Sequence, residues 1–242
     1  MRRSNAWADP AAALALRLPS LCAVCHGWGR SRVCSDCRAA FAAPRPRCRR
    51  CALVVTVGSD VCGECLTAPP AYDAALAAVE YAAPWDRLVT AFKFHGALEL
   101  APLFAQALGD AEARRASPRP DLVVPVPLAP ARLRERGYNQ AWELARRVAR
   151  RLGVRAEAQW LLRIRETAHQ LALPPTARAG MVHGAFAVEP RRRAEVAGRR
   201  IAVVDDVMTT GSTAAELVQV LKQAGAAAVE VWVVARTPRP GD

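Results

Sequence analysis

The stretch "RIAVVDDVMTTGST", Arg200 to Thr213, combines an apolar run, two adjacent carboxylates and several hydroxyls around one glycine. The apolar run is typical of a central parallel strand, and the residues from 213 onward are typical of a helix. The connection between them therefore lies at the carboxyl end of a strand, where open α/β sheets bind their ligands. Gly211 permits a tight turn, and the N–H groups that open the next helix can hold an anion.

This connection predicts a phosphate site made of Thr209, Thr210, Gly211, Ser212 and Thr213. Asp205 and Asp206 precede it at the distance where the sugar of a bound phosphate ester would lie. Carboxylates accept hydrogen bonds from sugar hydroxyls and lie close to bound Mg²⁺, so we expect a ribose 5-phosphate derivative as ligand. The alternatives are a buried strand with two capping acids, and a nucleotide-hydrolysing enzyme. The second is disfavoured because no G-x-x-x-x-G-K-[ST] loop is present.

Strand-like and helix-like segments alternate through the chain from residue 74, which predicts a mostly parallel α/β sheet. The strand-like segments cover residues 74–82, 122–128, 200–206 and 229–236, and the helix-like segments cover 85–94, 99–115, 139–153 and 213–225. Between them, residues 163–186 have no clear period. They are interpreted as a long loop, either a binding lid or a disordered segment.

All eight cysteines lie between Cys22 and Cys65, in four C-x2-C pairs. Two such pairs complete a tetrahedral zinc site, so the pattern predicts two structural Zn(II) ions. A disulfide framework, haem attachment at "CAVCH", an iron–sulfur cluster and a redox pair are the less favoured interpretations. Sequential pairing is expected, and interleaved pairing remains open. The predicted ligands are Cys22, Cys25, Cys34 and Cys37, then Cys48, Cys51, Cys62 and Cys65.

The 242-residue chain carries a net charge of +12, which favours a polyanionic partner, although its arginines are scattered. No uncharged run approaches the length of a membrane span, and the N-terminus does not have the pattern of a signal peptide. We therefore expect a cytoplasmic protein. Paired prolines after Cys65 mark a boundary, which gives an N-terminal segment at 1–20, a double zinc ribbon at 21–66 and an α/β domain at 72–238.

The stretch "VVDDVMTTGST" resembles the phosphoribosyl pyrophosphate (PRPP) binding signature of type I phosphoribosyltransferases. The cysteine pairs, followed by "FKFHG", "VVPVPLAPARLRERGYNQ", "AHQLALPPTARAG" and "GAF", resemble the ComF (competence protein F) family. The resemblance implies a type I phosphoribosyltransferase-like parallel sheet with a hood, preceded by a small zinc-ribbon module.

By this resemblance, Asp205 and Asp206 are the catalytic pair that holds the ribose hydroxyls, and Thr209 to Thr213 hold the 5-phosphate. The residues matched to pyrophosphate binding are Pro127, Leu128, Arg132 and Arg136, and those matched to the hood loop are Gln170 and Arg178. Met181 stands where the family commonly has an asparagine, which argues against a polar role there.

The resemblance also implies transfer of a phosphoribosyl group with release of pyrophosphate, with Mg(II), in DNA uptake (competence) or nucleotide salvage. No general base is evident, because His95, His169 and His183 are more typical of surface or core histidines. The alternative is a non-catalytic PRPP- or nucleotide-binding module whose zinc ribbons dock DNA-uptake proteins or single-stranded DNA.

Overall fold

The computed structural model describes residues 19–165 and 184–239, and the chain divides into two compact units, Met1–Ala43 and Pro44–Asp242. The first unit contains a short antiparallel pair, β1 (Ser20–Leu21) and β2 (Trp28–Gly29), and the helix α2 (Ser35–Phe41). The Cys34 sulfur caps this helix by accepting a hydrogen bond from the N–H of Cys37. The domain limits expected from the sequence remain a prediction.

The second unit begins with another cysteine-rich segment, which ends in α3 (Gly63–Thr67). This segment, residues 44–67, is called the second ribbon below. A β-bridge pairs Arg47 with Val54, and the N–H of Ala75 donates to the carbonyl of Arg49 at 3.0 Å. Ala52 is only 1% exposed and belongs to the core of the α/β domain. The second ribbon and this domain therefore share one core.

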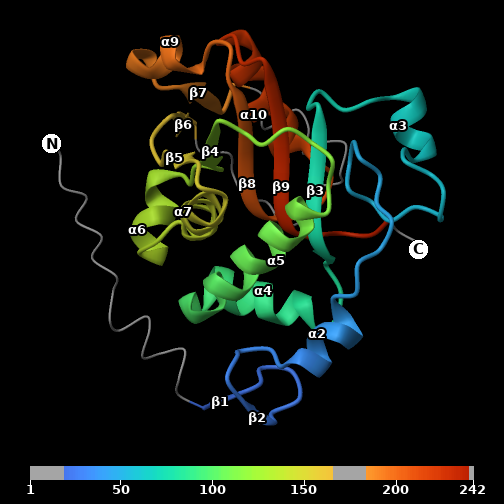
Figure 1. Ribbon diagram of the computed structural model, residues 1–242. Coiled ribbons are helices and arrows are strands. Elements are labelled where there is room, and N and C mark those ends of the chain that lie inside the picture. The colour runs from blue at the N-terminus through green and yellow to red at the C-terminus, as the bar shows by residue number, and fades with distance from the viewer. Residues whose placement is uncertain (1–18, 166–183, 240–242) are drawn as a thin grey trace, which may run out of the picture. The chain divides into compact units, whose positions relative to one another are not determined.

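Five parallel strands form the sheet in the order β3-β9-β8-β4-β5 (Figure 1). Their bounds are β3 Ala74–Glu80, β4 Leu122–Pro125, β5 Arg155–Ala156, β8 Arg200–Met208 and β9 Ala228–Arg236. β8 and β9 are apolar and buried, as central strands of a parallel sheet should be. The predicted α/β fold with a parallel sheet is confirmed.

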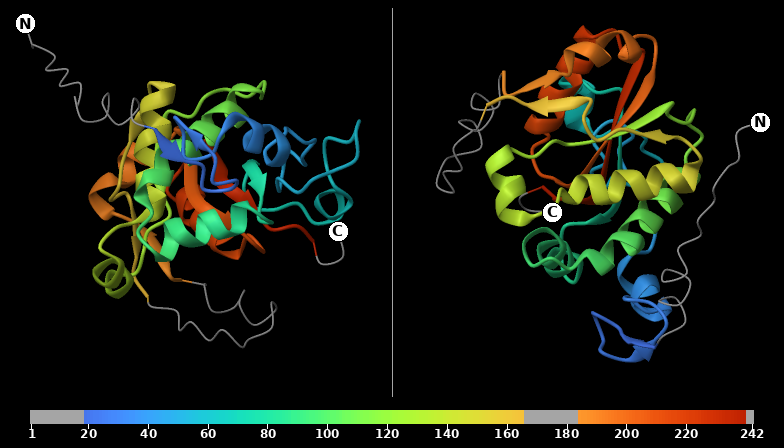
Figure 2. Two further views of the ribbon diagram at one scale, coloured as in Figure 1. Left: turned by 90° about the horizontal axis from the view of Figure 1, so that it is seen from below. Right: turned by 90° about the vertical axis from the view of Figure 1, so that its left-hand side faces the viewer.

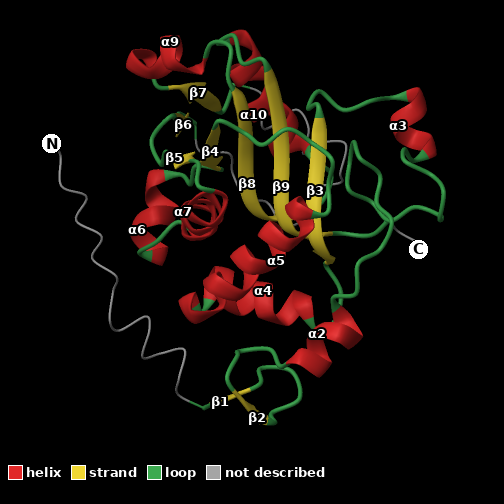
Figure 3. Cartoon of the chain, viewed as in Figure 1, coloured by secondary structure: helices red, strands yellow, loops and turns green. Residues whose placement is uncertain are grey.

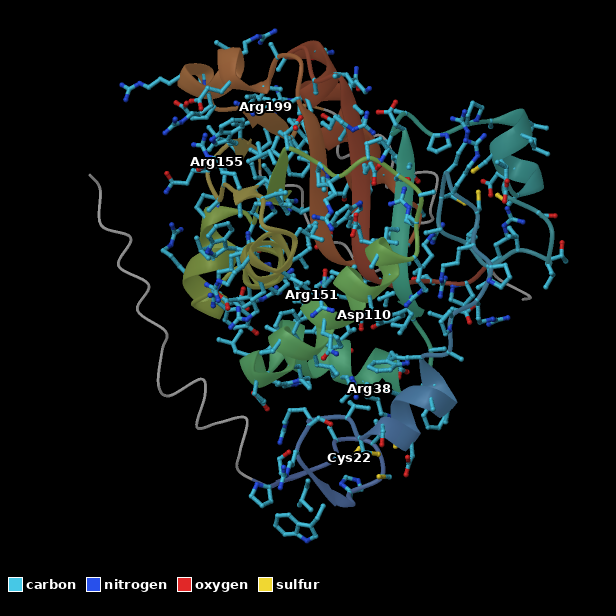
Figure 4. The ribbon with its side chains drawn as sticks, viewed as in Figure 1. Cys22, Arg38, Asp110, Arg151, Arg155 and Arg199 are labelled. Atoms are coloured by element: carbon cyan, nitrogen blue, oxygen red, sulfur yellow. The ribbon has the colours of Figure 1, made fainter. Side chains whose placement is uncertain are left out.

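Helices cover both faces of this sheet, with α5 (Ala101–Ala113) and α7 (Gln140–Leu152) on one face and α10 (Ser212–Gln223) on the other (Figures 1 and 2). The side chain of Arg151 lies directly over Gly109, where any Cβ would come within 2.5 Å of it, and Arg151 pairs with Asp110 at 2.6 Å (Figure 4). The absence of a side chain at Gly109 thus allows α7 to pack closely against α5. The remaining helices are α4 Trp85–Phe94, η1 Leu98–Leu100, α6 Pro130–Arg136, η2 Pro190–Arg192 and α9 Arg193–Val196.

A second small sheet pairs β6 (Leu161–Arg163) with β7 (Phe186–Val188) in antiparallel register (Figure 3). The sequence did not predict these strands, although they flank the expected long loop. Gln170 and Arg178, on which the hood assignment rests, lie outside the described residues. Among the helices that the structure does describe, none has the length and apolar character needed to span a membrane.

Candidate functional site

Asp205 and Asp206 are adjacent on β8, so their side chains leave opposite faces of the sheet. Asp206 is 1% exposed and faces α4. There the ammonium of Lys93 lies 2.9 Å from its Oδ2 and 3.2 Å from its Oδ1. Burial alone would raise the pKa of Asp206, but the Lys93 charge brings that pKa below its ordinary value. Asp206 and Lys93 therefore form a buried ion pair.

Asp205 lies on the other face and lines a small cavity of about 70 Å³ together with residues 209–214. Burial, followed by the neighbouring Asp206 carboxylate, raises the pKa of Asp205 well above its ordinary value. One Asp205 oxygen accepts a hydrogen bond from the N–H of Asp206 at 2.8 Å. A cation or a ligand hydroxyl at this carboxylate would offset the cost of ionising it, which makes Asp205 the stronger ligand candidate of the two.

The loop after β8 has the geometry of an anion cradle. Gly211 has φ of 81°, and α10 begins at the next residue with no side-chain cap at its N-terminus. Ser212 donates its N–H to the Thr210 hydroxyl, but the structure shows no partner for the N–H groups of Thr209 and Gly211 among the residues it describes. Uncapped N–H groups at a helix N-terminus favour a bound phosphate.

The two segments matched to pyrophosphate binding differ in their surroundings. Pro127 and Leu128 follow β4 at the same edge of the sheet, where the N–H of Val126 donates to the Val204 carbonyl at 2.9 Å. Arg132 is exposed and pairs with Glu135 inside α6, at 2.6 Å.

Arg136 instead lies 5.1 Å from the centre of the Phe94 ring, and Lys93 lies 5.8 Å from the same ring. The two cations thus share one aromatic neighbour. The structure brings Arg136, but not Arg132, to the Lys93 side of the site.

A second, larger cavity of about 820 Å³ lies on the other side of the loop, between α10 and the second ribbon. Cys51 and Cys65 line it, as do Thr210, Gly211 and Ser212. One buried side chain connects the loop to the ribbon across this region, since Arg236 donates to the carbonyls of Cys51 and Thr209. Beside it, the Tyr72 hydroxyl donates to the sulfur of Met208, the last residue of β8, at 3.8 Å.

The cysteines form two separate clusters, sequential rather than interleaved. Within each cluster the four sulfurs lie within 4.8 Å of one another. The sulfurs of Cys25 and Cys34 are 3.8 Å apart, and those of Cys51 and Cys62 are 3.6 Å apart. Figure 4 labels Cys22, which belongs to the first of these clusters. Four sulfurs at about 2.3 Å from one tetrahedral zinc would be about 3.8 Å apart, so both clusters fit this ion.

Within the first cluster the thiols differ in their pKa values. The pKa of Cys22 is lowered to about 6 against the effect of burial, because backbone N–H groups donate to its sulfur. Burial and the neighbouring sulfurs raise the pKa of Cys37 to about 12. A divalent cation would let all four thiols ionise together.

We expect protein purified without added metal to contain about two Zn(II) per chain, because each cluster supplies a closed four-thiolate shell. Elemental analysis by mass spectrometry measures this content. Cys25→Ser and Cys51→Ser each remove one ligand from one cluster and should lower the zinc content separately. Iron in place of zinc, or a content unchanged in both variants, would contradict the assignment.

Sequence reasoning missed three residues of this region: Lys93, Tyr72 and Arg236. Composition offered one signal. The chain has 34 lysines and arginines in total, and only two of them are lysines. A lysine is therefore unusual in this chain, and one of the two, Lys93, contacts Asp206. Tyr72 and Arg236 offered no comparable signal, because their partners lie far away in the sequence.

Comparison with known proteins finds relatives that align with most of this chain. Residues 139–241 match the phosphoribosyl transferase domain. The chain is 35% identical to DNA utilization protein YhgH of Escherichia coli K12 over 92% of this chain and 99% of that protein. It is 31% identical to competence protein F of Haemophilus influenzae over 89% of this chain and 96% of that protein. Among solved structures, adenine phosphoribosyltransferase of Leishmania tarentolae aligns with a TM-score of 0.41 and 12% identity, over 70% of this chain and 93% of that one.

Proposed function

Because the chain belongs to the ComF (competence protein F) family and carries a phosphoribosyltransferase domain, we propose that it binds PRPP and transfers the phosphoribosyl group with release of pyrophosphate. The names of its relatives link them to DNA utilization and competence, and a role in DNA uptake is part of the proposal for this chain. The observation that carries it is that Asp205 and the uncapped loop before α10 line one cavity.

In this assignment the loop N–H groups and the hydroxyls of Thr209, Thr210, Ser212 and Thr213 bind the 5-phosphate. Asp205 accepts hydrogen bonds from the ribose hydroxyls, and Asp206 acts mainly through Lys93, which it holds at the carboxyl edge of the sheet. Lys93 and Arg136 then present positive charge beside that edge, where the departing pyrophosphate would develop negative charge. Most of the rate acceleration would come from positioning and charge stabilisation.

Magnesium fits this donor set. Burial raises the pKa of Asp205, and the Lys93 charge offsets this only in part, so the Asp205 carboxylate would hold Mg²⁺ together with the ligand's own oxygens. The ion would supply charge neutralisation of the pyrophosphate.

Calorimetry with PRPP and Mg²⁺, followed by a pyrophosphate-release assay against a panel of nucleobases and ammonia, tests the proposal. Binding together with acceptor-dependent release of pyrophosphate is the expected result. Absence of PRPP binding to metal-loaded, folded protein would overturn it.

The second candidate is a PRPP- or nucleotide-binding module without turnover, which docks a DNA-uptake protein or single-stranded DNA. One observation favours it: among the described residues that line the small cavity, Asp205 is the only titratable one, so no separate general base lies there. Tight binding of PRPP without pyrophosphate release from any acceptor in the panel would identify this second function.

We expect Arg136→Ala to weaken PRPP binding roughly tenfold, the effect of losing about one charged hydrogen bond, and to leave ribose 5-phosphate binding nearly unchanged. Arg132→Ala should have a smaller effect on PRPP, since Arg132 pairs with Glu135 on the exposed side of α6. Calorimetry with both ligands measures the difference.

Arg134→Ala, in the last turn of the same helix, controls for the loss of one positive charge from α6. An equal loss of affinity for PRPP and ribose 5-phosphate in Arg136→Ala would remove Arg136 from the pyrophosphate site.

A further inference from the structure

The loop after β8, residues 209–213, is called the phosphate loop below. One buried arginine attaches it to the second ribbon. Arg236, the last residue of β9, is 8% exposed. Its Nε donates to the carbonyl of Cys51 at 2.9 Å, and Cys51 belongs to the second cysteine cluster. Its Nη1 donates to the carbonyl of Met208 at 3.0 Å and to the carbonyl of Thr209. One planar group thus joins a metal-binding segment to the first turn of the loop.

These contacts have a direct consequence for the direction of the loop's N–H groups. In a trans peptide unit the carbonyl and the N–H point in opposite directions. Because Arg236 holds the carbonyls of Met208 and Thr209, the N–H groups of Thr209 and Thr210 are directed away from it. Those N–H groups belong to the residues that line the small cavity beside Asp205. Arg236 therefore fixes the orientation of the Thr209 carbonyl, and it shares the Met208 carbonyl with the N–H of Thr237.

Few other contacts hold the loop on this side. The cavity of about 820 Å³ separates Thr210, Gly211 and Ser212 from most of the second ribbon. Tyr72 and Thr237 provide further contacts. The Tyr72 hydroxyl contacts the Met208 sulfur and lies 3.4 Å from where a Cβ on Gly211 would be, and the N–H of Thr237 donates to the Met208 carbonyl at 3.0 Å. Because a cavity lies behind the loop, the position of Thr209 depends strongly on the Arg236 contact to its carbonyl, while Met208 is held by Tyr72 and Thr237 as well.

We propose that Arg236 is a positioning residue through which the second cysteine cluster, Cys48, Cys51, Cys62 and Cys65, holds the phosphate loop in its binding shape. The second cluster then contributes to the phosphate site, although none of its cysteines lines the small cavity beside Asp205. The first cluster belongs to the other compact unit and serves as the comparison. The inference rests on the proposed function for its ligand, but the contact itself exists without one.

The decisive measurement is hydrogen–deuterium exchange of the peptide that spans residues 205–214, in metal-loaded protein without ligand. Arg236→Lys keeps the charge but cannot span the ribbon and the loop as a planar guanidinium does. We expect it to raise exchange in this peptide roughly tenfold or more, the effect of losing one hydrogen bond to a charged donor. Arg199→Lys is the matched control, because Arg199 also donates to a backbone carbonyl but precedes β8 at its opposite end (Figure 4).

A second set of variants removes one cysteine from each cluster in turn. Cys51→Ser should raise exchange in 205–214, whereas Cys25→Ser should not, although each lowers the zinc content. Unchanged exchange in Arg236→Lys, or equal effects of Cys25→Ser and Cys51→Ser, would overturn the proposal.

If Arg236→Lys or Cys51→Ser does not fold, the Cys25→Ser protein still decides the question, because it holds metal at the second cluster alone. Chelation of that metal must raise exchange in 205–214, and constant exchange on metal loss would contradict the coupling. PRPP affinity is measured in parallel. If the wild type does not bind PRPP, the proposed function fails, while the exchange data still test the link between cluster and loop.

Discussion

Asp205→Asn is expected to weaken PRPP binding in the presence of Mg²⁺ by about 1.5–3 kcal/mol, the value of a hydrogen bond to a charged group, while the protein stays folded. The pKa of Asp205 is raised in the folded state, so its ionised form destabilises the fold as the pH rises above the ordinary value of 3.8. Removing the charge should therefore leave the free energy of unfolding unchanged or increase it. Calorimetry and urea unfolding at neutral pH measure the two effects.

Asp206→Asn is the matched comparison, and we expect it to lower the free energy of unfolding. The pKa of Asp206 is lowered by Lys93 in the folded state, so its ion pair stabilises the protein above pH 3.8, and this stability is lost as the pH falls through the depressed pKa. Breaking a fully buried pair costs about 3–5 kcal/mol. The cost should be lower here, because the Lys93 side chain is 30% exposed and water can solvate its charge. If Asp205→Asn leaves PRPP affinity intact in a protein that binds PRPP, Asp205 is a structural residue.

Gly211→Val should abolish measurable PRPP binding. Gly211 has φ of 81°, and a side chain in this region costs about 1–2 kcal/mol, more when β-branched. The new Cβ would also lie 3.4 Å from the Tyr72 hydroxyl and 3.7 Å from the Met208 sulfur. These distances are ordinary van der Waals contacts for the Cβ, so the main cost is the positive φ, which a β-branched residue resists. We expect the loop to move away from this conformation, and its N–H groups with it.

Gly198→Val separates strain in general from damage to the loop. Gly198 has φ of 72°, it precedes β8 at the opposite end from the loop, and nothing lies within 4 Å of a Cβ placed there. We expect similar destabilisation in both variants by thermal unfolding, with loss of PRPP binding in Gly211→Val alone. Normal PRPP affinity in Gly211→Val would show that the loop does not bind the phosphate.

The parts of the fold that follow from local pattern were predictable. β8 was predicted because its apolar run is long, and the loop after it because hydroxyls and Gly211 follow directly. The short strands β6 and β7 were missed, since three residues each give too little pattern to detect.

The contacts that organise the site were not predictable from one sequence, because they are long-range. Lys93 and Asp206 are 113 residues apart, and Cys51 and Arg236 are 185 residues apart. No local rule connects such pairs. The sequence pattern also placed Asp205 and Asp206 together as one functional pair. In the structure Asp206 forms the ion pair with Lys93 and Asp205 lines the small cavity, which supports different roles.

The burial of Ala52 has a consequence for how this gene can change by recombination. A crossover near residue 43 would transfer all four cysteines of the first cluster together, because they lie within one compact unit. A crossover near residue 70 would separate the second cluster from the domain core that Ala52 helps to fill. The second cluster and the α/β domain should therefore be inherited together.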